Sequence, residues 1–275
     1  MTSEQAGRET DILAPPTPAR HQSAGRRGRP IALRVASFVI FAAIWEIAGR
    51  VPISFAFPTF SETVTALASM LLSGELPQAY VQTLQPLVLG VVLSTLIGVS
   101  VGVFCGLWKP AEWMLIPVFV VLQAAPVAAL IPLVTFVYGI GLTAKTLAVI
   151  ILALPVIVLN SYRAVENVNA TLLAMCRSFL GNRRQAIFKI VLPDASPVIF
   201  AGLRLGIAAG FVGVVLAELL ITPTGIGDLI TFYRSRAHYA EMYATIVSII
   251  ALSTFTLLAV QWFEVGVFRP EKRGA

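Results

Sequence analysis

The sequence has few charged residues. Only 12% of its 275 residues are Asp, Glu, Lys or Arg, whereas soluble domains carry about 25%. Its hydrophobic fraction is 57% and its mean hydropathy is +0.84. The charges are too few, and too clustered, to cover a water-facing surface. This shortage excludes a soluble globular protein and predicts a polytopic membrane protein.

Cysteine and histidine are nearly absent as well. Cys105 lies in an apolar run and Cys176 in a basic loop, so we expect two thiols and no disulfide framework. The two histidines, His21 and His238, belong to distant segments, which excludes a zinc cluster and a Ser/His/Asp arrangement. The chain is therefore predicted to have no metal site, no cofactor of its own and no catalytic function.

A nucleotide-binding loop is also missing, because none of the four lysines follows a glycine. Energy for any work must therefore come from outside this chain. The net charge of +6 invites a nucleic-acid interpretation, but the basic residues are distributed as membrane orientation requires. No nucleic-acid partner is predicted.

Six apolar runs are long enough to cross a bilayer. The first, residues 31–49, would reach about 28 Å as a helix, close to the roughly 30 Å of a hydrocarbon core. The other five are residues 86–108, 113–138, 146–162, 197–221 and 243–268. The sequence therefore predicts an all-α fold with six transmembrane helices surrounded by membrane lipid.

The N-terminal segment, residues 1–30, is rich in arginine and proline and has little apolar periodicity, which predicts a disordered basic arm. Residues 31–270 form the predicted transmembrane domain, and residues 271–275 form a short tail. Arg26 and Arg27 suggest a twin-arginine signal as an alternative, but Glu46 lies within the following apolar run and no cleavage pattern follows it.

Basic residues gather on one side of the six predicted helices. Fifteen of the twenty fall between the N-terminus and Arg34, at Lys109, in the 163–196 loop and from Arg269 onward. Because cytoplasmic segments carry the excess of Lys and Arg, both termini and this loop are predicted to be cytoplasmic. The four assigned to the outer side are Arg50, Lys145, Arg234 and Arg236.

Two of the runs carry small residues at every fourth position. They are Gly90, Ser94, Gly98, Gly102 and Gly106 in the second run, and Gly202, Gly206 and Gly210 in the fifth. Such stripes let helix backbones approach closely. The alternative is that these glycines serve as flexible hinges.

The third run is interrupted by Pro117, Pro126 and Pro132. Each proline removes a backbone donor, and the freed carbonyls need a neighbouring helix or a water-filled cavity. Helices broken in this way often line transport routes. Gln123 and Pro126 are therefore candidates for a translocation path.

Three ionisable residues lie inside the last two runs. Arg204 and Glu264 are both near the predicted cytoplasmic face and are expected to form a structural charge pair. Glu218 is about 21 Å from Arg204 along the same helix and cannot pair with it. A place on the translocation path and a helix-packing hydrogen bond remain equal alternatives for Glu218.

The connecting segments predict further helices. Thr59 and Glu62 have the spacing of a capping box, followed by the apolar periodicity of a short amphipathic helix. The 163–196 loop is longer than a connection needs, which predicts a helical hairpin with an apolar face. Its apolar stripe is Leu172, Cys176, Phe179 and Leu180, with Arg177, Arg183 and Arg184 away from it.

The segment from Ala174 to Pro193 closes with Ile190, Leu192 and Pro193. It resembles the Glu-Ala-Ala loop of inner-membrane permeases from binding-protein-dependent ABC importers. The neighbouring motifs are similar to the nitrate, sulfonate and taurine type of permease, over roughly residues 32–268. These motifs are Phe57-Pro-Thr-Phe-Ser-Glu62, Phe200-Ala-Gly-Leu-Arg-Leu-Gly206, Gly213-Val-Val-Leu-Ala-Glu218 and Thr224-Gly-Ile-Gly-Asp-Leu-Ile230.

The resemblance implies a type I ABC importer permease of the inner membrane, whose path carries a small solute such as a sulfonate, nitrate or related anion. It implies three partners: cytoplasmic ABC ATPase subunits, a periplasmic solute-binding protein and a second copy of the chain. A secondary ion-coupled carrier is the alternative. It predicts a second set of broken helices, and the sequence shows no convincing one.

The resemblance also implies a coupling helix, from Met175 to Gln185, seated in a groove of the ATPase. The implied contact residues are Leu172, Cys176, Arg177, Phe179, Leu180, Gly181, Arg183, Arg184, Leu192 and Pro193. Aligned without a gap, the first Glu of the family motif falls on Ala174 and its glycine on Leu180. These departures imply altered contacts of the loop, for which a specialised ATPase partner is the leading explanation and an inactive copy of the permease is the alternative.

Overall fold

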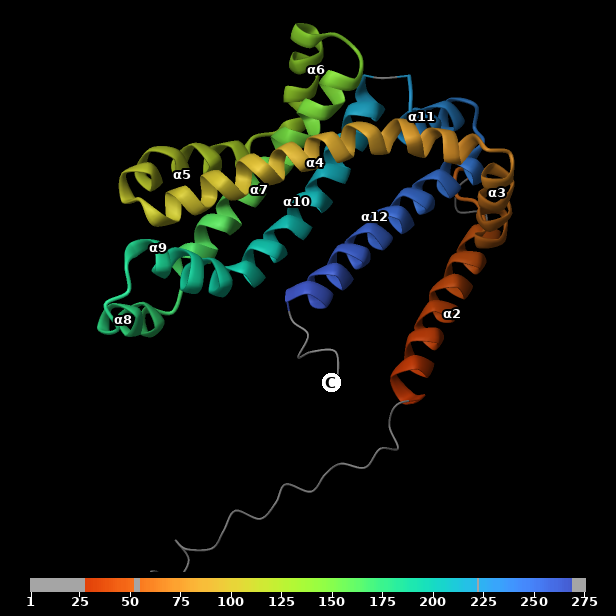
Figure 1. Ribbon diagram of the computed structural model, residues 1–275. Helices are drawn as coiled ribbons and strands as arrows, with labels where there is room; N and C mark the ends of the chain where they lie inside the picture. Colours follow the sequence, from red (N-terminus) through yellow and green to blue (C-terminus); the bar gives the residue numbers. More distant parts are fainter. Residues whose placement is uncertain (1–27, 52–54, 222, 269–275) are drawn as a thin grey trace, which may run out of the picture. The chain divides into compact units, whose positions relative to one another are not determined.

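The computed structural model describes residues 28–51, 55–221 and 223–268, and every regular element among them is helical (Figure 1). The predicted basic arm and tail lie almost wholly outside these residues. The helices are α2 Gly28–Arg50, α3 Phe60–Leu72, α4 Glu75–Leu107, α5 Lys109–Ala124, α6 Val127–Tyr138, α7 Leu142–Glu166, α8 Ala170–Ser178, α9 Arg183–Ala186, the π-helix η3 Ile187–Val191, α10 Leu192–Leu220, α11 Ile226–Ser235 and α12 Tyr239–Phe268. The prediction of an all-α fold is confirmed.

Four helical segments among the described residues are long and apolar enough to cross a membrane: α4, α7, the segment that ends in α10, and α12. The pair α5 and α6 together makes a possible fifth. The predicted first span coincides with α2, which is not among these candidates. Four to five spans are therefore supported, and the sixth stays a prediction.

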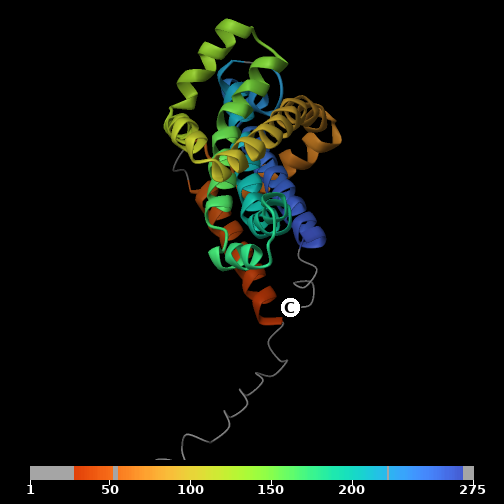
Figure 2. The ribbon, with the colours of Figure 1, turned by 60° about the vertical axis from the view of Figure 1, so that its left-hand side comes forward.

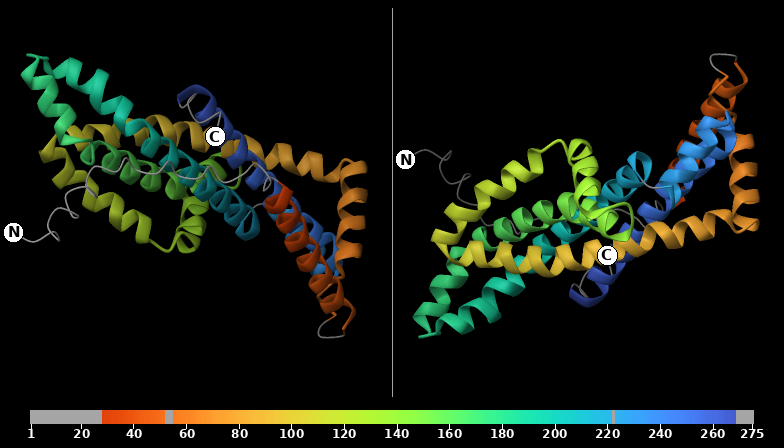
Figure 3. Two further views of the ribbon diagram at one scale, coloured as in Figure 1. Left: turned by 90° about the horizontal axis from the view of Figure 1, so that it is seen from below. Right: turned by 90° about the horizontal axis from the view of Figure 1, so that it is seen from above.

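The third run was expected to be one span interrupted by its prolines, and the structure shows where the run breaks. It forms two helices, α5 and α6, that meet at a bend of 100° (Figure 3). The chain leaves the helical conformation at Ala125, with ψ 141°, directly before Pro126, because a proline disfavours the α conformation of the preceding residue. Pro117 and Pro132 remain inside their helices.

The core of the bundle is formed by α7, which packs against both α4 and α10 (Figures 1 and 2). The glycine stripe of α4 lies on α7. A Cβ on Gly98 would be 2.8 Å from a methyl carbon of Ile157, and one on Gly102 would be 2.6 Å from the Val158 carbonyl oxygen.

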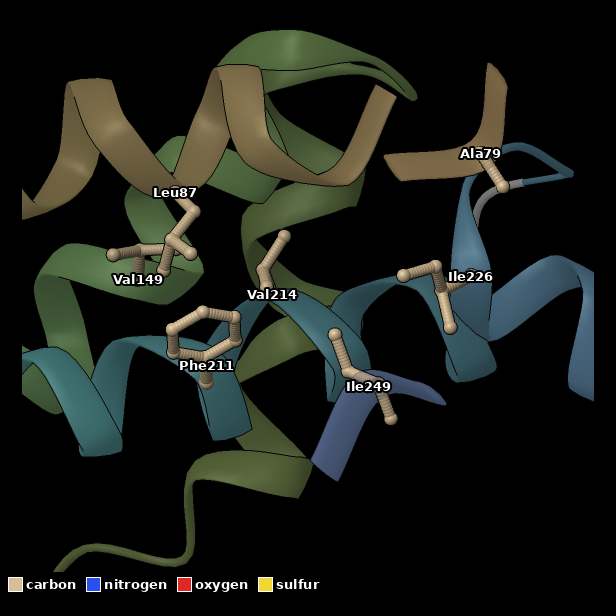
Figure 4. Packing of buried hydrophobic residues seen from close by; sticks show 7 residues of the cluster. All are labelled: Ala79, Leu87, Val149, Phe211, Val214, Ile226 and Ile249. Carbon is tan, nitrogen blue, oxygen red and sulfur yellow. The ribbon is translucent and has the colours of Figure 1, made fainter. Parts of the chain in front are cut away.

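The stripe of α10 meets α7 from another side. A Cβ on Gly213, which follows the predicted stripe, would lie 2.8 Å from the Ala148 carbonyl oxygen. The start of α11 and the first half of α12 join this core in an apolar cluster (Figure 4), made of Ala79, Leu87, Val149, Phe211, Val214, Ile226 and Ile249. The prediction that both stripes bring helices close together is confirmed.

The short amphipathic helix is also confirmed. Thr59 caps α3 through a hydrogen bond from the Glu62 N–H to its side chain, and the Glu62 side chain accepts from the Thr59 N–H at 2.9 Å. Two orphan donors at the start of the helix are thus satisfied. Met70 of α3 is buried beside Leu76 and Tyr233.

Candidate functional site

The connection between α7 and α10 is a compact helical loop, as the sequence predicted. Its first helix, α8, begins at Asn169, whose side chain accepts from the Thr171 N–H at 2.9 Å. The Asn169 N–H donates to Asp194 Oδ2 at 3.1 Å, which ties the start of α8 to the first turn of α10. The loop is therefore held at both of its ends by the bundle helices.

A single coupling helix from Met175 to Gln185 was expected, and the structure shows this to be wrong. Helix α8 ends at Ser178, and α9 begins only at Arg183. The Leu180 N–H donates to the Arg177 carbonyl at 3.0 Å and the Gly181 N–H to the Cys176 carbonyl at 2.9 Å. These two bonds form a Schellman motif, which terminates α8.

The residue at the left-handed position of this motif is Leu180, with φ 56°. It is the position on which the family motif places glycine, and the Schellman geometry explains that preference, because glycine has no Cβ penalty there. Gly181 serves a different need. A Cβ on Gly181 would lie 2.8 Å from the Cys176 carbonyl oxygen, so the turn closes only around a glycine.

The predicted apolar stripe divides into two parts. Leu172 and Cys176 are half-buried, whereas Phe179 is 81% exposed and Leu180 is 94% exposed at the turn. Leu192 and Pro193, at the start of α10, line a groove of 680 Å³ between α4 and α10. The loop thus presents an apolar tip rather than a continuous helical face.

The charge of this loop has one sign only. Between Ala170 and Pro193 the sequence contains no Asp or Glu. Its four basic residues, Arg177, Arg183, Arg184 and Lys189, are all exposed. The apolar tip is therefore surrounded by positive charge.

A second cluster of polar groups is buried where α4, α7, α10 and α11 meet. Lys145 Nζ lies 2.9 Å from Glu218 Oε1, and the two side chains are 5% and 0% exposed. Lys145 also donates to the carbonyl and the hydroxyl of Thr224, at 3.0 and 2.9 Å. Each of the three hydrogens of the Lys145 ammonium group thus has an acceptor.

The carboxylate of Glu218 has further donors. Thr83 Oγ1 lies 2.9 Å from Oε2 and donates to the carboxylate, and the Gly227 N–H donates to Oε2 at 3.0 Å. The Ile226 N–H in turn donates to Thr83 Oγ1 at 3.0 Å. This Lys145–Glu218 network anchors the turn before α11 to three long helices.

Glu218 was a candidate for the translocation path or for a packing hydrogen bond. The contacts of Glu218 are those of a residue that holds helices together. Its fully buried side chain does not support a place on the translocation path. Lys145 was assigned to an outer loop, but it lies in the first turn of α7 and is 4% exposed. The sequence did hold one sign that Lys145 belongs to the helix, because it directly precedes the apolar run that begins at residue 146.

Tyr233 provides another buried contact at this end of the bundle. Its hydroxyl donates to Glu75 Oε1 at 2.6 Å. Burial first, and then the hydrogen bond to Glu75, raise the pKa of the Tyr233 hydroxyl well above its ordinary value. The side chain therefore stays protonated and serves as a donor between α11 and α4.

The structure brings Arg204 and Glu264 together. Arg204 Nη2 lies 3.5 Å from Glu264 Oε2, which is an ion-pair distance without hydrogen-bond geometry. Glu264 is buried, and Arg204 is partly exposed beside a cavity of 430 Å³ between α10 and α12. The arrangement agrees with a structural pair that holds α12 against α10.

Gln123 and Pro126 lie at the bend between α5 and α6, and both are exposed. The buried residues of these two helices are only Ala111 and Ile131. Large apolar side chains such as Met114 and Phe136 are 74% and 90% exposed. Within one chain, the bend is therefore left uncovered.

Among the described residues, no three His, Cys, Asp or Glu side chains are close enough to hold a metal ion. Cys105 is buried and Cys176 is half-buried, and both are free thiols.

Comparison with known proteins identifies relatives along most of the chain. Residues 98–269 match the family model described as "Binding-protein-dependent transport system inner membrane component". A Bacillus subtilis permease named for aliphatic sulfonates transport, SsuC, is 27% identical over 227 residues, 82% of each chain. The taurine transport system permease protein TauC of Escherichia coli is 23% identical over 254 residues, 89% of each chain.

The fold is similar to that of a solved transporter. A chain from inward-facing conformations of the MetNI methionine ABC transporter superposes with a TM-score of 0.58 at 18% identity. The match covers 69% of this chain and 94% of that chain. At this identity the likeness shows the fold alone.

Proposed function

Because this chain belongs to the family of binding-protein-dependent transport system inner membrane components, we propose that it forms half of the translocation path of an importer for a small anion. Proteins of this family are multi-pass permeases rather than enzymes. ATP is handled by a separate ATPase subunit, and a binding protein delivers the solute.

The observation that carries the coupling part of this proposal is the exposed apolar tip of the loop between α7 and α10. Phe179 and Leu180 stand on a turn held by two backbone hydrogen bonds. An exposed apolar patch of this kind is typical of a protein contact. The loop is proposed to seat in the ATPase, with the tip as its anchor.

The substrate class follows from the relatives. SsuC and TauC are named for aliphatic sulfonates and taurine, and these solutes share a sulfonate group. A small organic sulfonate or a similar anion is therefore the proposed substrate of this chain. The binding protein, rather than the permease, is expected to supply most of the affinity.

A second copy of the chain is proposed to complete the path. The irregular backbone at Ala125 and Pro126 is only half-buried at Ala125 and is exposed at Pro126, and such backbone is not tolerated against lipid. A second copy, facing the bend across a cavity, would cover it and place Gln123 and Pro126 beside the solute.

A secondary carrier remains the weaker alternative. Carriers of that kind use paired broken helices from two repeated halves. In the described ranges, one bent pair of helices, α5 with α6, is apolar enough to form a broken span. The single break favours an ATP-driven permease.

Replacing Phe179 with Asp should abolish co-purification of the ATPase, because it puts a charge into the proposed apolar contact. Native mass measurement of the wild-type complex should show two permeases and two ATPase subunits. Phe55→Asp, at a fully exposed phenylalanine of another loop, is the matched control and should change neither result. If Phe179→Asp kept its ATPase and its taurine uptake, the loop would not be the coupling site.

The orientation is open to a direct test. Both termini are proposed to be cytoplasmic because of the basic residues on that side. A reporter that is active only outside the cytoplasm should be silent when fused after Ala275 and active when fused after Gly74, in the turn between α3 and α4. The opposite pattern would invert the topology.

A further inference from the structure

The most unusual backbone position in the loop is Leu180. It occupies the left-handed position of the Schellman motif with φ 56°, a conformation in which any Cβ is crowded by the following carbonyl oxygen. Residues held in such conformations persist where the surroundings over-determine them, and they cluster at functional sites.

Burial among the described residues does not offset this cost, because the Leu180 side chain is 94% exposed. Its neighbour Phe179 is 81% exposed. The loop therefore carries both a strained backbone position and exposed apolar surface at the same place. Both are accounted for if the side chain is buried against another protein.

A second position of the same kind provides the comparison. Ala237, in the turn between α11 and α12, has φ 58°. Its N–H donates to the Arg234 carbonyl and the His238 N–H to the Tyr233 carbonyl, which is again a Schellman motif. The backbone cost is shared by the two turns, but only Leu180 carries a large apolar side chain.

The charge around the tip indicates what kind of surface receives it. Arg177, Arg183, Arg184 and Lys189 are exposed, and no acidic residue lies between Ala170 and Pro193. A complementary partner has an acidic rim, since charge complementarity selects partners and suppresses wrong ones. The fixed shape of the turn suits a preformed protein pocket better than a fluid lipid surface.

We infer that the Leu180 side chain is the anchor by which this permease selects its own ATPase subunit, whose groove has an apolar pocket for Leu180 inside an acidic rim. This inference rests on the proposed function, in which the loop couples to the ATPase. Beyond that function, we assign partner choice to one residue. Leu180 stands where the turn would favour glycine, and its side chain determines which ATPase fits.

The test measures ATPase binding and permease stability in the same variants, using the purified full-length permease and the ATPase subunit of the same transport system. Leu180→Gly should raise the apparent melting temperature of the permease by roughly 2 to 4 °C and weaken ATPase binding by about tenfold or more. Leu180→Asn, whose side chain tolerates the left-handed conformation, should weaken binding by a similar factor. Leu180→Met retains an apolar side chain and should bind within about threefold of wild type.

Ala237→Gly is the matched control. It relieves the same backbone conformation in the other Schellman motif, so it should raise the melting temperature without changing ATPase binding. The acidic rim predicts that binding weakens with added salt, and that the double variant Arg183→Gln, Arg184→Gln binds more weakly with a flatter salt dependence.

Wild-type binding by both Leu180→Gly and Leu180→Asn would overturn the inference. If Phe179→Asp nevertheless lost the ATPase, the coupling site would stand and only the anchor would be withdrawn. If Phe179→Asp also bound normally, the coupling proposal itself would fail. Weaker binding of the Leu180 variants in anionic nanodiscs but not in neutral detergent would assign the tip to lipid and overturn the inference.

Discussion

Replacing Glu218 with Ala should destabilise the folded permease by about 3 to 5 kcal/mol, because it leaves the buried Lys145 charge without a counter-charge. Lys145 is 4% exposed and its ammonium lies 2.9 Å from the carboxylate. The Gly227 N–H, which donates to the same carboxylate, would lose its acceptor too. Thermal unfolding of the purified protein, and its yield in the membrane, measure the loss.

The control is Glu166→Ala at the end of α7. Glu166 lies 4.0 Å from Lys109, and the two side chains are 44% and 67% exposed, so this change should cost less than about 1 kcal/mol. The double variant Lys145→Met, Glu218→Leu removes both charges with little change of volume. It should recover much of the stability that either single change loses.

Equal stability of Glu218→Ala and Glu166→Ala would contradict the network. A double variant as unstable as Glu218→Ala would show that the hydrogen bonds of Thr83 and Gly227, rather than the ion pair, hold the four segments together.

Replacing Gly102 with Leu should prevent α4 from packing on α7. A Cβ at this position already lies 2.6 Å from the Val158 carbonyl oxygen and from Ser161 Cβ. A backbone oxygen cannot turn away as a flexible side chain can, so the helices must separate. The expected loss is at least about 3 kcal/mol, measured as thermal stability and as yield of monodisperse permease.

Ser100→Leu is the control for added bulk on the same helix, because Ser100 is exposed. It should fold normally. The hinge alternative makes a different prediction for Gly102→Leu: a normally folded protein with slow transport. Gly213→Leu, opposite the Ala148 carbonyl on the other side of α7, repeats the test for α10.

The sequence alone determined the class of this protein and the positions of most helices. Hydropathy is a sum over single residues, so it needs no knowledge of neighbours. The runs at 86–108, 146–162, 197–221 and 243–268 each fall within a long helix to within one residue at their ends. The capping box at Thr59 is likewise local. The family motifs are linear patterns, and they pointed to a permease before any contact was known.

Local patterns were less informative about where a helix breaks. Three prolines marked the third run, but the helix is broken at only one of them, where Ala125 and Pro126 lie outside both helices. Whether a proline ends a helix depends on what satisfies the freed carbonyl, which is a property of neighbouring segments. The left-handed conformation of Leu180 could not be predicted from the sequence for a similar reason, because a leucine side chain does not favour that conformation.

The tertiary structure alone decided which faces and charges meet. A glycine stripe indicates a close contact, but only the packed helices show that the stripes of α4 and α10 share α7 as their partner. Lys145 and Glu218 are 73 residues apart, and the charge rule placed Lys145 in an outer loop. Ion pairing between helices depends on their relative rotation and depth, which arise from packing the whole bundle and are encoded in no single stretch of the chain.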